Sequence, residues 1–350
     1  MIKPLTQWYQ LYARELPWRK EPTAYGVWVS EIMLQQTRVE AVKEYYIRFM
    51  QELPTIKALS EASEERLLKL WQGLGYYNRV KNMQKAAIEI MEQYQGQLPM
   101  SYEKLLKLKG IGEYTAGAIS SIAFGLPEAA VDGNVLRVMT RLTADGRDIT
   151  QKEVKKDFYN RIKELLQHTN PSIFNQALME LGAVICLPNG VPKCEICPLQ
   201  GYCQAYQQNR MMDFPYKAPK KPRKVENRMM FFILFENKVA LCKRPQKGLL
   251  SNLWELPNIL LEEEISPFQQ LFDWGILCGK VEPLGNAKHI FTHIQWNMEG
   301  YFVKAKALEG KQCDFVWVTE EEMRSHYALP SAFRYYMEKG WKEGKKEYEF

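Results

Sequence analysis

The sequence has no apolar run long enough to span a bilayer, so we do not expect an integral membrane protein. Its first residues, MIKPLTQWYQLYARELPW, lack the apolar core and small-residue cleavage site of a signal peptide. We therefore expect a cytoplasmic protein whose cysteines stay reduced. The cysteine count, seven, is odd, which argues against a disulfide framework and leaves a metal site or chance.

The composition is that of a globular protein. The chain of 350 residues is long enough for two domains. Hydrophobic residues make up 46% of it and charged residues 25%, which is typical of a chain with a packed core. The formal net charge is +6, and this mildly basic balance permits nucleic acid as a partner without requiring it.

Up to about residue 210, apolar residues recur at helical spacing, which predicts an all-α region. Within the helical stretch 27–50, Glu31 and Gln35 lie four residues apart and share a face. A solvated carboxylate is the simplest interpretation of Glu31, and an N-cap that of Asp132, which precedes a helix at 135–143. Further helices are predicted at 5–17, 60–71, 80–94, 153–168 and 174–185.

The segment 105–135 has the most distinctive pattern of this region. Two apolar helical runs meet at Gly110-Ile111-Gly112. A hairpin of this kind points backbone N–H groups outward at a helix N-terminus, which suits a phosphate group. The alternative is a helical hairpin with a glycine C-cap and no ligand.

Two aromatic segments have both a structural and a functional interpretation. Tyr76 lies in the glycine-containing turn 73–79, either as a wedge between nucleic-acid bases or as part of a buried aromatic turn. Trp18 and Arg19 end the first helix, where the simplest interpretation is a packed indole and a snorkelling arginine.

Four cysteines close the helical region with the spacing C-x7-C-x2-C-x5-C, at Cys186, Cys194, Cys197 and Cys203. Four thiolates in a short loop interrupted by prolines indicate a metal centre. Zinc and a [4Fe–4S] cluster both take four thiolates, and the spacing alone does not choose between them.

The character of the chain changes at 213–226, where the sequence reads DFPYKAPKKPRKVE. This predicts a semi-rigid basic linker, either a solvated tether or a phosphate contact. After it come the β-type segments MMFFILFE and VALCKRP, with a hairpin turn between them. Further strands are predicted at 289–296, 299–305 and 315–318 and helices near 263–274 and 320–337, which together indicate an α+β domain.

The combination of these motifs resembles the MutY-type adenine DNA glycosylases, a family of helix-hairpin-helix base-excision enzymes. The resemblance covers nearly the whole chain. Its motifs are SEIMLQQT at 30–37, GLGYYNR at 73–79, LKGIGEYTAG at 108–117, VDGNV at 131–135, FNQALMELGA at 174–183 and the cysteine loop. It implies a two-lobed, mainly α catalytic domain at 1–212 with a [4Fe–4S] loop at 186–203, a linker at 213–225 and a Nudix-like α+β domain at 226–350.

The resemblance also implies the catalytic residues. Releasing adenine requires one protonated and one ionised carboxyl group. Glu31 matches the family residue that protonates adenine at N7, which requires a raised pKa supplied by burial. Asp132 matches the residue that stabilises the oxocarbenium-like sugar, and Tyr114 and Asn134 are expected to orient these groups and the water.

A base inside a duplex cannot reach these groups, so the adenine must be flipped out. By resemblance, the cysteine loop holds the [4Fe–4S] cluster, although the seven residues between its first two cysteines exceed the usual six. The expected DNA contacts are Trp18, Arg19 and Gln176 at the adenine pocket, Gln35, Gln36 and Tyr76 at the opened base step, and Gly110, Gly112 and Lys193 at the backbone.

One position separates the branches of this superfamily. Relatives like endonuclease III carry a lysine where this chain has Tyr114, and its amine forms a Schiff base that permits strand cleavage. We therefore expect a monofunctional glycosylase that leaves an abasic site. The alternatives are an endonuclease III-like glycosylase for oxidised pyrimidines and a non-catalytic DNA-binding adaptor.

The C-terminal domain is predicted to recognise rather than hydrolyse. The acidic signature of Nudix hydrolases is missing, and Glu262-Glu263-Glu264 does not match it. Phe291-Thr292-His293 lies where the family reads 8-oxoguanine with a Phe-Ser-His turn, so Thr292 keeps the hydroxyl and adds a methyl. The expected partner is double-stranded DNA with an 8-oxoguanine:adenine mispair, bound by a nucleoid-associated monomer.

Overall fold

The computed structural model describes residues 1–219, 222–309 and 314–346. The chain forms two compact units. The helical unit comprises Met1–Ala62 and Asn78–Pro219, and the sheet unit comprises Ser63–Tyr77 and the chain after Pro219. Within the described part of the chain, no helix is both long and apolar enough to cross a membrane. Lys220 and Lys221 of the predicted linker lie outside the described residues.

The helical unit confirms the all-α prediction for this region. Turns and loops join its helices, and the longest loop is the cysteine-containing segment between α12 and α13. The helix α9 (Glu113–Ala118) continues as a π-helical turn, η1 (Ile119–Ala123). The helices are α1 (Ile2–Tyr12), α2 (Pro17–Lys20), α3 (Ala24–Leu34), α4 (Val39–Glu52), α5 (Ile56–Glu61), α7 (Asn78–Gln93), α8 (Tyr102–Leu105), α9 (Glu113–Ala118), α10 (Gly133–Thr143), α11 (Lys152–Leu166), α12 (Pro171–Val184) and α13 (Gln204–Gln207).

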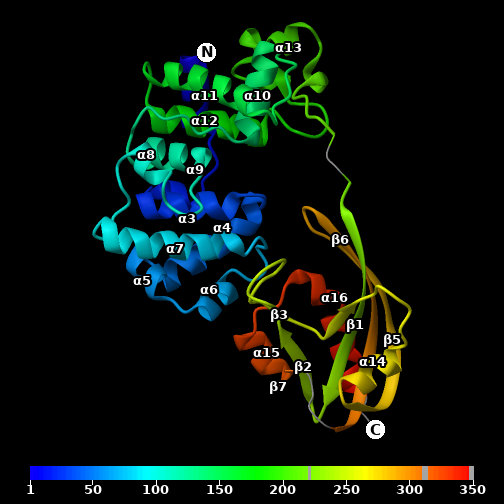
Figure 1. Ribbon diagram of the computed structural model, residues 1–350. Coiled ribbons are helices and arrows are strands. Elements are labelled where there is room, and N and C mark those ends of the chain that lie inside the picture. The colour runs from blue at the N-terminus through cyan, green and yellow to red at the C-terminus, as the bar shows by residue number, and fades with distance from the viewer. Residues whose placement is uncertain (220–221, 310–313, 347–350) are drawn as a thin grey trace. The chain divides into compact units, whose positions relative to one another are not determined.

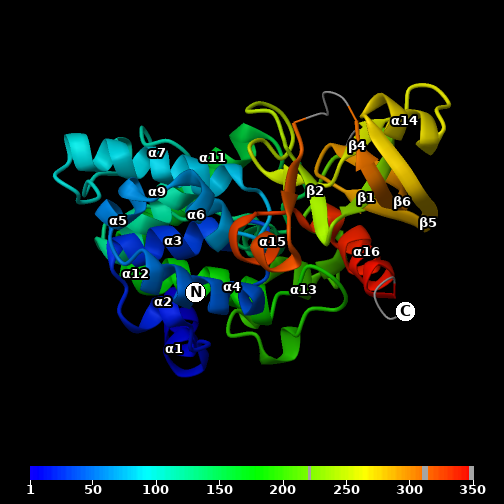
Figure 2. The same ribbon diagram turned by 90° about the horizontal axis from the view of Figure 1, so that it is seen from below.

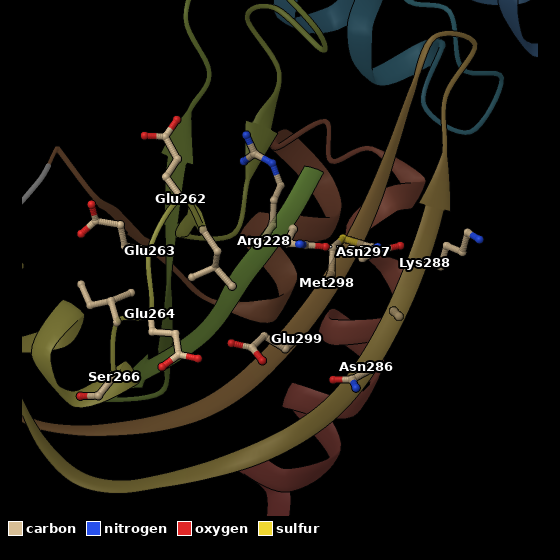
Figure 3. Close-up of a pocket in the computed structure, with 14 residues that line it drawn as sticks. Arg228, Glu262, Glu263, Glu264, Ser266, Asn286, Lys288, Asn297, Met298 and Glu299 are labelled. Carbon is tan, nitrogen blue, oxygen red and sulfur yellow. Dashed lines mark hydrogen bonds between the residues drawn. The ribbon is translucent and has the colours of Figure 1, made fainter. Parts of the chain in front are cut away.

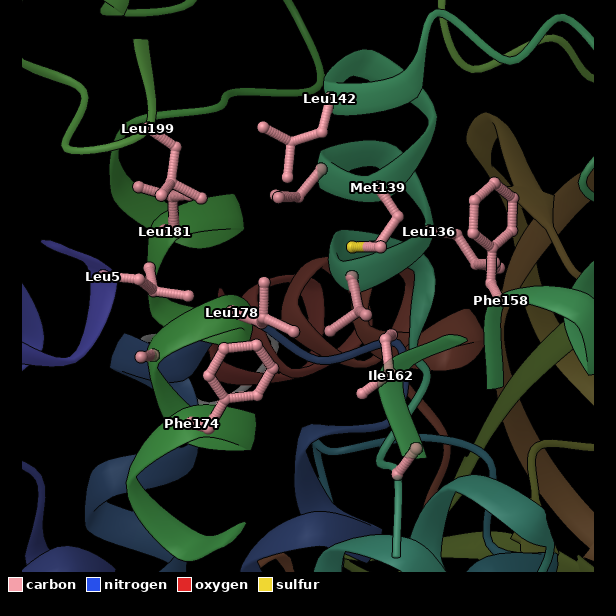
Figure 4. Packing of buried hydrophobic residues seen from close by; sticks show 14 of the residues in the cluster. Leu5, Leu136, Met139, Leu142, Phe158, Ile162, Phe174, Leu178, Leu181 and Leu199 are labelled. Carbon is pink, nitrogen blue, oxygen red and sulfur yellow. The ribbon is translucent and has the colours of Figure 1, made fainter. Parts of the chain in front are cut away.

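The helix α12 is central to one hydrophobic core of this unit. Figure 4 shows its apolar side chains facing those of α10 and α11, and α1 adds Leu5. Phe174 and Leu178 of α12 and Phe158 and Ile162 of α11 are completely buried. Burial of each such side chain contributes roughly 1.5–3 kcal/mol, which holds α12 firmly against its neighbours.

The predicted continuous helix over 27–50 is wrong, because α3 ends at Leu34 and a second helix, α4, begins at Val39. Gln36 has a left-handed φ of 59°, which ends the helical path. The guanidinium of Arg79 stabilises the C-terminal end of α3. Its Nη1 donates to the carbonyls of Ile32 (2.8 Å), Met33 (3.0 Å) and Gln35 (2.6 Å). A distant arginine thus caps α3 at its C-terminus.

The sheet unit is built on a seven-stranded sheet with the order β3-β2-β1-β6-β5, to which β4 and β7 add at β1 and β2. The central pair β1–β6 is parallel. The strands are β1 (Lys224–Phe235), β2 (Lys238–Lys243), β3 (Trp254–Glu255), β4 (Asn258–Leu260), β5 (Ile276–Ile290), β6 (Ile294–Leu308) and β7 (Val316–Val318).

Both faces of this sheet are covered, which explains the continuous apolar run in β1. Met230, Phe232 and Leu234 pack with Tyr336 of α16 (Arg334–Lys346) on one face. The alternate residues Met229, Phe231 and Ile233 pack with Leu271 of α14 (Pro267–Asp273) on the other. Figure 2 shows α14 and α16 on opposite sides of the strands.

The turn chemistry of this unit was predicted in part. Glu236 and Asn237 both have positive φ, 46° and 63°, and form the predicted hairpin between β1 and β2. The predicted strand 289–296 is wrong, because residues 291–293 form the turn between β5 and β6 (Figure 1). The predicted helix 320–337 is divided into α15 (Glu320–His326) and α16, with Pro330 between them.

The sheet unit also takes in a segment that is distant in sequence. The helix α6 (Glu64–Leu70) contacts α15. Lys69 Nζ donates to the carbonyl of Tyr327 and Gln72 Nε2 to that of Leu329, each at 3.2 Å. These contacts explain why 63–77 groups with the sheet unit, which the sequence did not predict.

Candidate active site

The predicted hairpin is present between α8 and α9. Gly110 has a φ of +80°, and a Cβ there would lie 2.7 Å from Asn82 Cβ, so this position requires glycine. Gly112 is the N-cap of α9 and has open space around its Cα. Both glycines are exposed, and Lys193 is exposed elsewhere in this unit. The first N–H groups of α9 have no intrahelical acceptors.

Glu31 lies in the middle of α3 and is only 6% exposed, so the interpretation as a solvated carboxylate is wrong. Tyr114 of α9 donates its hydroxyl proton to Glu31, and the same hydroxyl lies 3.3 Å from Met179 Sδ of α12. Burial raises the pKa of Glu31 to about 7, although the bond from Tyr114 opposes the rise. The carboxyl group is therefore protonated in a large fraction of molecules near neutral pH.

Asp132 is the N-cap of α10, as predicted, and its carboxylate is fully engaged. Oδ1 accepts from Val135 N at 2.7 Å, and Oδ2 accepts from Asn134 Nδ2 at 2.8 Å. Burial raises the pKa of Asp132 above its usual value, although these hydrogen bonds favour the ionised form and oppose the rise. The charge of Asp132 also raises the pKa of Glu31, so the two carboxyl groups are within electrostatic reach.

Asn134 is held in turn by Arg137. Arg137 Nη2 donates to Asn134 Oδ1 at 2.9 Å and to the carbonyl of Gly182 at 2.7 Å, and its Nε donates to the carbonyl of Cys186 at 2.8 Å. A Cβ at Gly182 would lie 2.7 Å from Asn134 Cβ, so α12 packs closely against this residue. One guanidinium therefore joins the Asp132–Asn134 pair to the start of the cysteine loop.

Arg19 and Gln176 belong to a network around Glu180 of α12. Glu180 accepts from Arg14 Nε at 2.7 Å and from Arg19 Nη2 at 2.8 Å. Burial alone would raise the pKa of Glu180, but the two arginines lower it to about 2. Tyr9 lies below the Arg19 guanidinium and donates its hydroxyl proton to Gln176 Oε1 at 3.0 Å.

Trp18 and the glutamine pair occupy different environments. Trp18 is buried, with its indole edge-on to Tyr46 at 5.4 Å between ring centroids, which is the packing that its simplest interpretation predicted. Gln35 Nε2 donates to Thr115 Oγ1 at 3.4 Å, so α3 and α9 meet beside Tyr114. Gln36 is exposed at the left-handed position that ends α3.

The four cysteines surround a small cavity of about 30 Å³. Arg141 Nη1 donates to Cys186 Sγ at 3.2 Å, and Cys203 Sγ donates to the Arg141 carbonyl at 3.4 Å. Among the described residues, no three His, Cys, Asp or Glu side chains are arranged to hold a single metal ion. Thiolates are ligands of both zinc and [4Fe–4S] clusters, so four thiols that line one cavity fit a metal centre.

The predicted recognition turn lies between the two longest strands of the sheet unit. Phe291 is held between the rings of His289 and Trp296, at 4.5 and 4.8 Å between centroids. Thr292 Oγ1 lies 3.4 Å from the hydroxyl of Tyr76, and both side chains are exposed. Tyr76 has a left-handed φ of 48°, and His293 is exposed next to Thr292.

A second feature of this unit is a cavity of about 1160 Å³ between the sheet and the segment 261–266 (Figure 3). Strands β1, β6 and β5 form its floor with Asn227, Asn297 and Lys288 in one row, because these residues pair across the strands. Glu262, Glu263 and Glu264 lie along its wall, so the acidic triplet lines a cavity without forming the Nudix signature.

Several residues that hold this site together were not predicted from the sequence, namely Arg79, Arg137, Arg141, Asn175 and Glu180. Asn175 and Glu180 are in the motif FNQALMELGA, where only Gln176 was assigned. A buried charge or amide on the core-facing side of a strongly apolar helix is the signal that was available, since such groups require partners.

Comparison with known proteins finds a family match in each of the two regions of the chain. Residues 29–164 match the HhH-GPD superfamily of base excision DNA repair proteins, and residues 229–339 match the NUDIX domain. The adenine DNA glycosylase of Rattus norvegicus is 35% identical, over 95% of this chain and 77% of its own length. That of Buchnera aphidicola subsp. Baizongia pistaciae is 37% identical, over 83% of this chain and 82% of its own.

A solved structure supports the fold of the helical unit. A thermostable thymine-DNA glycosylase aligns with 59% of this chain and 95% of its own at a TM-score of 0.54 and 26% identity. The family suggested by the sequence motifs is confirmed by the curated relatives. The chain belongs to the adenine DNA glycosylase family, with an HhH-GPD helical region followed by a Nudix-like domain.

Proposed function

We propose that this protein removes adenine mispaired with 8-oxoguanine, or with guanine, from double-stranded DNA by hydrolysis and leaves an abasic site. The observation that carries the proposal is the pair of unlike carboxyl groups. Burial raises the pKa of Glu31 to about 7, whereas at Asp132 two hydrogen bonds that favour the ionised form oppose the rise caused by burial. Such a pair supplies an acid and an anion at the same pH.

In the reaction, Glu31 donates its proton to N7 of the flipped adenine, which makes the base a better leaving group. Positive charge then develops on the sugar, and the ionised Asp132 stabilises it. Asn134 holds Asp132 Oδ2, and Tyr114 holds Glu31, so both carboxyl groups keep their orientation while the proton moves. After the C1′–N bond has broken, water forms the new bond to C1′ and gives its proton to the Glu31 carboxylate, which restores the acid.

Tyr114 also supports a monofunctional reaction. It stands in the second helix of the hairpin, where a Schiff-base glycosylase carries lysine, and a phenol has no amine to attack the sugar. Burial raises the pKa of Tyr114 well above its usual value, so the phenol stays neutral and acts as a hydrogen-bond donor.

We assign the remaining contacts by the same argument. Arg19 and Gln176 lie on one network beside the acid and are proposed to line the adenine pocket, with Trp18 supporting them from the core. Gln35, Gln36 and Tyr76 are proposed to fill the opened base step. Gly110, Gly112 and Lys193 are proposed to contact backbone phosphates, since all three are exposed.

The sheet unit is proposed to read 8-oxoguanine through Phe291, Thr292 and His293. The turn is exposed and Phe291 is fixed by its ring neighbours, so the hydroxyl and imidazole that follow it are presented from a rigid base. Comparing wild type with Thr292→Ser and Thr292→Val tests this role. Loss of preference for 8-oxoguanine over guanine in the valine variant alone supports hydroxyl recognition, and an unchanged preference in both refutes it.

The cysteine loop is proposed to hold a [4Fe–4S] cluster through Cys186, Cys194, Cys197 and Cys203. Iron–sulfur clusters are typical of this family. When bound, the cluster supplies a rigid cross-link between the four thiolates, and the loop can then present Lys193 to DNA. Broad visible absorbance with stoichiometric iron and sulfide supports this assignment, and a colourless zinc-loaded protein refutes it.

We further propose a monomer located with the nucleoid in the cytoplasm, with domains at 1–212 and 226–350 joined by the linker 213–225.

The direct test of the function is base release. A duplex with adenine opposite 8-oxoguanine should yield free adenine without a direct strand nick. No adenine release, with activity on an oxidised pyrimidine instead, would favour the endonuclease III-like alternative. Duplex binding without any base release would favour a non-catalytic adaptor.

A further inference from the structure

The segment 128–131 delivers Asp132 to the site, yet it has no regular secondary structure. The backbone groups of such a segment need partners wherever they are buried. Ala129 and Ala130 are buried, and the segment leads directly to Asp132, the N-cap of α10. The contacts of this short segment therefore determine where the carboxylate of Asp132 lies.

Asn175 of α12 supplies those contacts from one side. It is 0% exposed, and both the nitrogen and the oxygen of its side-chain amide form hydrogen bonds. Nδ2 donates to the carbonyl of Glu128 at 2.9 Å, and Oδ1 accepts from Ala130 N at 3.0 Å. One side-chain amide thus pairs with two alternate residues of an extended segment, as the backbone of a neighbouring strand would.

Two other helices hold the same segment. A Cβ on Gly117 of α9 would lie 2.1 Å from the carbonyl oxygen of Ala129, so the backbone of α9 touches the segment directly. The carboxylate of Glu128 accepts from Lys163 Nζ of α11 at 2.7 Å and from the hydroxyl of Tyr159. The segment is therefore fixed between α9, which carries Tyr114, and α12, which carries Asn175.

From this arrangement we infer that Asn175 is a positioning residue for base removal, acting through the segment 128–131 on Asp132. The inference rests on the proposed role of Asp132. Without the amide, Ala130 N and the Glu128 carbonyl lose their partners in the core, and the segment shifts to find others. A displacement of the carboxylate by about 1 Å is enough to slow a reaction roughly 100-fold, while DNA contacts elsewhere stay intact.

Two variants of Asn175 test the inference. Asn175→Leu keeps the volume and removes both hydrogen bonds, whereas Asn175→Asp keeps the acceptor for Ala130 N and loses the donor to Glu128. We expect the single-turnover rate of adenine release to fall about 10- to 100-fold in the leucine variant and less in the aspartate variant. The dissociation constant for the mispaired duplex should change less than about threefold, because no phosphate contact is removed.

The matched control is Thr140→Val. Thr140 is also 0% exposed, and its hydroxyl donates to the carbonyl of Arg137 at 3.0 Å within α10, so the control removes a buried hydrogen bond without touching 128–131. It should lose stability with little loss of single-turnover rate. Gly117→Ala should resemble Asn175→Leu, because it displaces Ala129 from the opposite side.

The outcomes separate the inference from the proposed function. A wild-type rate in Asn175→Leu, or a rate loss no larger than that of Thr140→Val at equal melting temperature, overturns the inference. A wild-type protein that releases no adenine contradicts the proposed function instead. In that case hydrogen exchange at the Ala130 amide tests whether Asn175 holds the segment 128–131. Faster exchange in Asn175→Leu than in Thr140→Val supports this role of Asn175, and equal exchange refutes it.

Discussion

Glu31 on α3 and Glu180 on α12 are both buried glutamates, at 6% and 1% exposure, but their surroundings treat the charge in opposite ways. Around Glu180, Arg14 and Arg19 overcome the effect of burial and lower the pKa to about 2. Around Glu31, the principal partner is the neutral phenol of Tyr114, and the pKa rises to about 7. Burial raises the pKa of both carboxyl groups, and it prevails beside the neutral phenol but not beside the two arginines.

The two glutamates are also linked through Arg19. Arg19 lowers the pKa of Glu31, but only as the smallest of its causes. The Arg19 guanidinium donates to Glu180 at 2.8 Å, which engages its charge away from the acid. The following predictions test this difference, beginning with the largest expected effect.

Replacing Glu31 with glutamine should nearly abolish base removal. Glutamine keeps the size and the hydrogen bond with Tyr114 but has no acidic proton, and a positioned general acid contributes about 10²- to 10⁴-fold to a rate. Single-turnover adenine release measures the loss. Glu44→Gln, at an exposed position of α4, is the control and should keep the wild-type rate. Activity of Glu31→Gln within a few-fold of wild type would show that another group supplies the proton.

Replacing Glu180 with glutamine should destabilise the fold by about 3 kcal/mol, because it leaves two arginines without their counter-charge. The folded pKa of Glu180 lies below its usual value of 4.5. Its contribution is therefore complete above pH 4.5 and is lost as the pH falls toward 2. Urea unfolding at pH 7 and pH 3 should show the gap between wild type and variant narrowing in acid. Glu164→Gln, exposed on α11, should change stability by less than about 0.5 kcal/mol.

The same substitution at Glu31 should have the opposite effect on stability. The folded pKa of Glu31 is about 7 and its usual value is 4.5. The wild type therefore keeps full stability below pH 4.5 and loses up to about 3 kcal/mol as the pH rises through 7, since each pKa unit is worth about 1.4 kcal/mol. Glu31→Gln avoids this loss, so it should be more stable than wild type at pH 8 and nearly equal at pH 4.5. A destabilised variant at pH 8 would contradict the raised pKa.

Replacing Tyr114 with phenylalanine should have the smallest effect. The hydrogen bond from Tyr114 lowers the pKa of Glu31, so its loss should raise that pKa above 7 and extend activity to higher pH. The rate at neutral pH should fall by less than about tenfold, because the acid itself remains. Product gels should still show no strand nick, since neither side chain has an amine. An unchanged pH profile would show that the phenol does not act on Glu31.

The sequence predicted those parts of the helical unit that depend on local chemistry. The N-cap at Asp132, the glycine hairpin at 110–112 and the hairpin turn predicted at 236–238 follow from preferences within a few residues, although the structure confines that turn to 236–237. The end of α3 was not predictable in this way. It depends on Arg79, which is more than 40 residues away in the chain and donates to two carbonyls of α3 and to that of its C-cap, Gln35.

Prediction of the active site from the sequence was limited in the same way. Motif resemblance indicated Glu31, Asp132 and Tyr114, and the structure brings their elements together. It did not indicate that Asn175 holds the segment before Asp132 or that Glu180 engages Arg19, because both contacts join elements more than 40 residues apart. A pKa set by such contacts cannot be read from the neighbours of a residue in sequence.

The central claim is that Glu31 acts as a protonated acid, and the pH dependence of adenine release tests it most directly. The measurement is the single-turnover rate with a saturating duplex that carries adenine opposite 8-oxoguanine, from pH 5 to 9. We predict a rate that falls about tenfold per pH unit above a midpoint near 7, with Glu31→Gln showing no such midpoint. A wild-type rate that stays constant or increases from pH 7 to 9 would contradict the account.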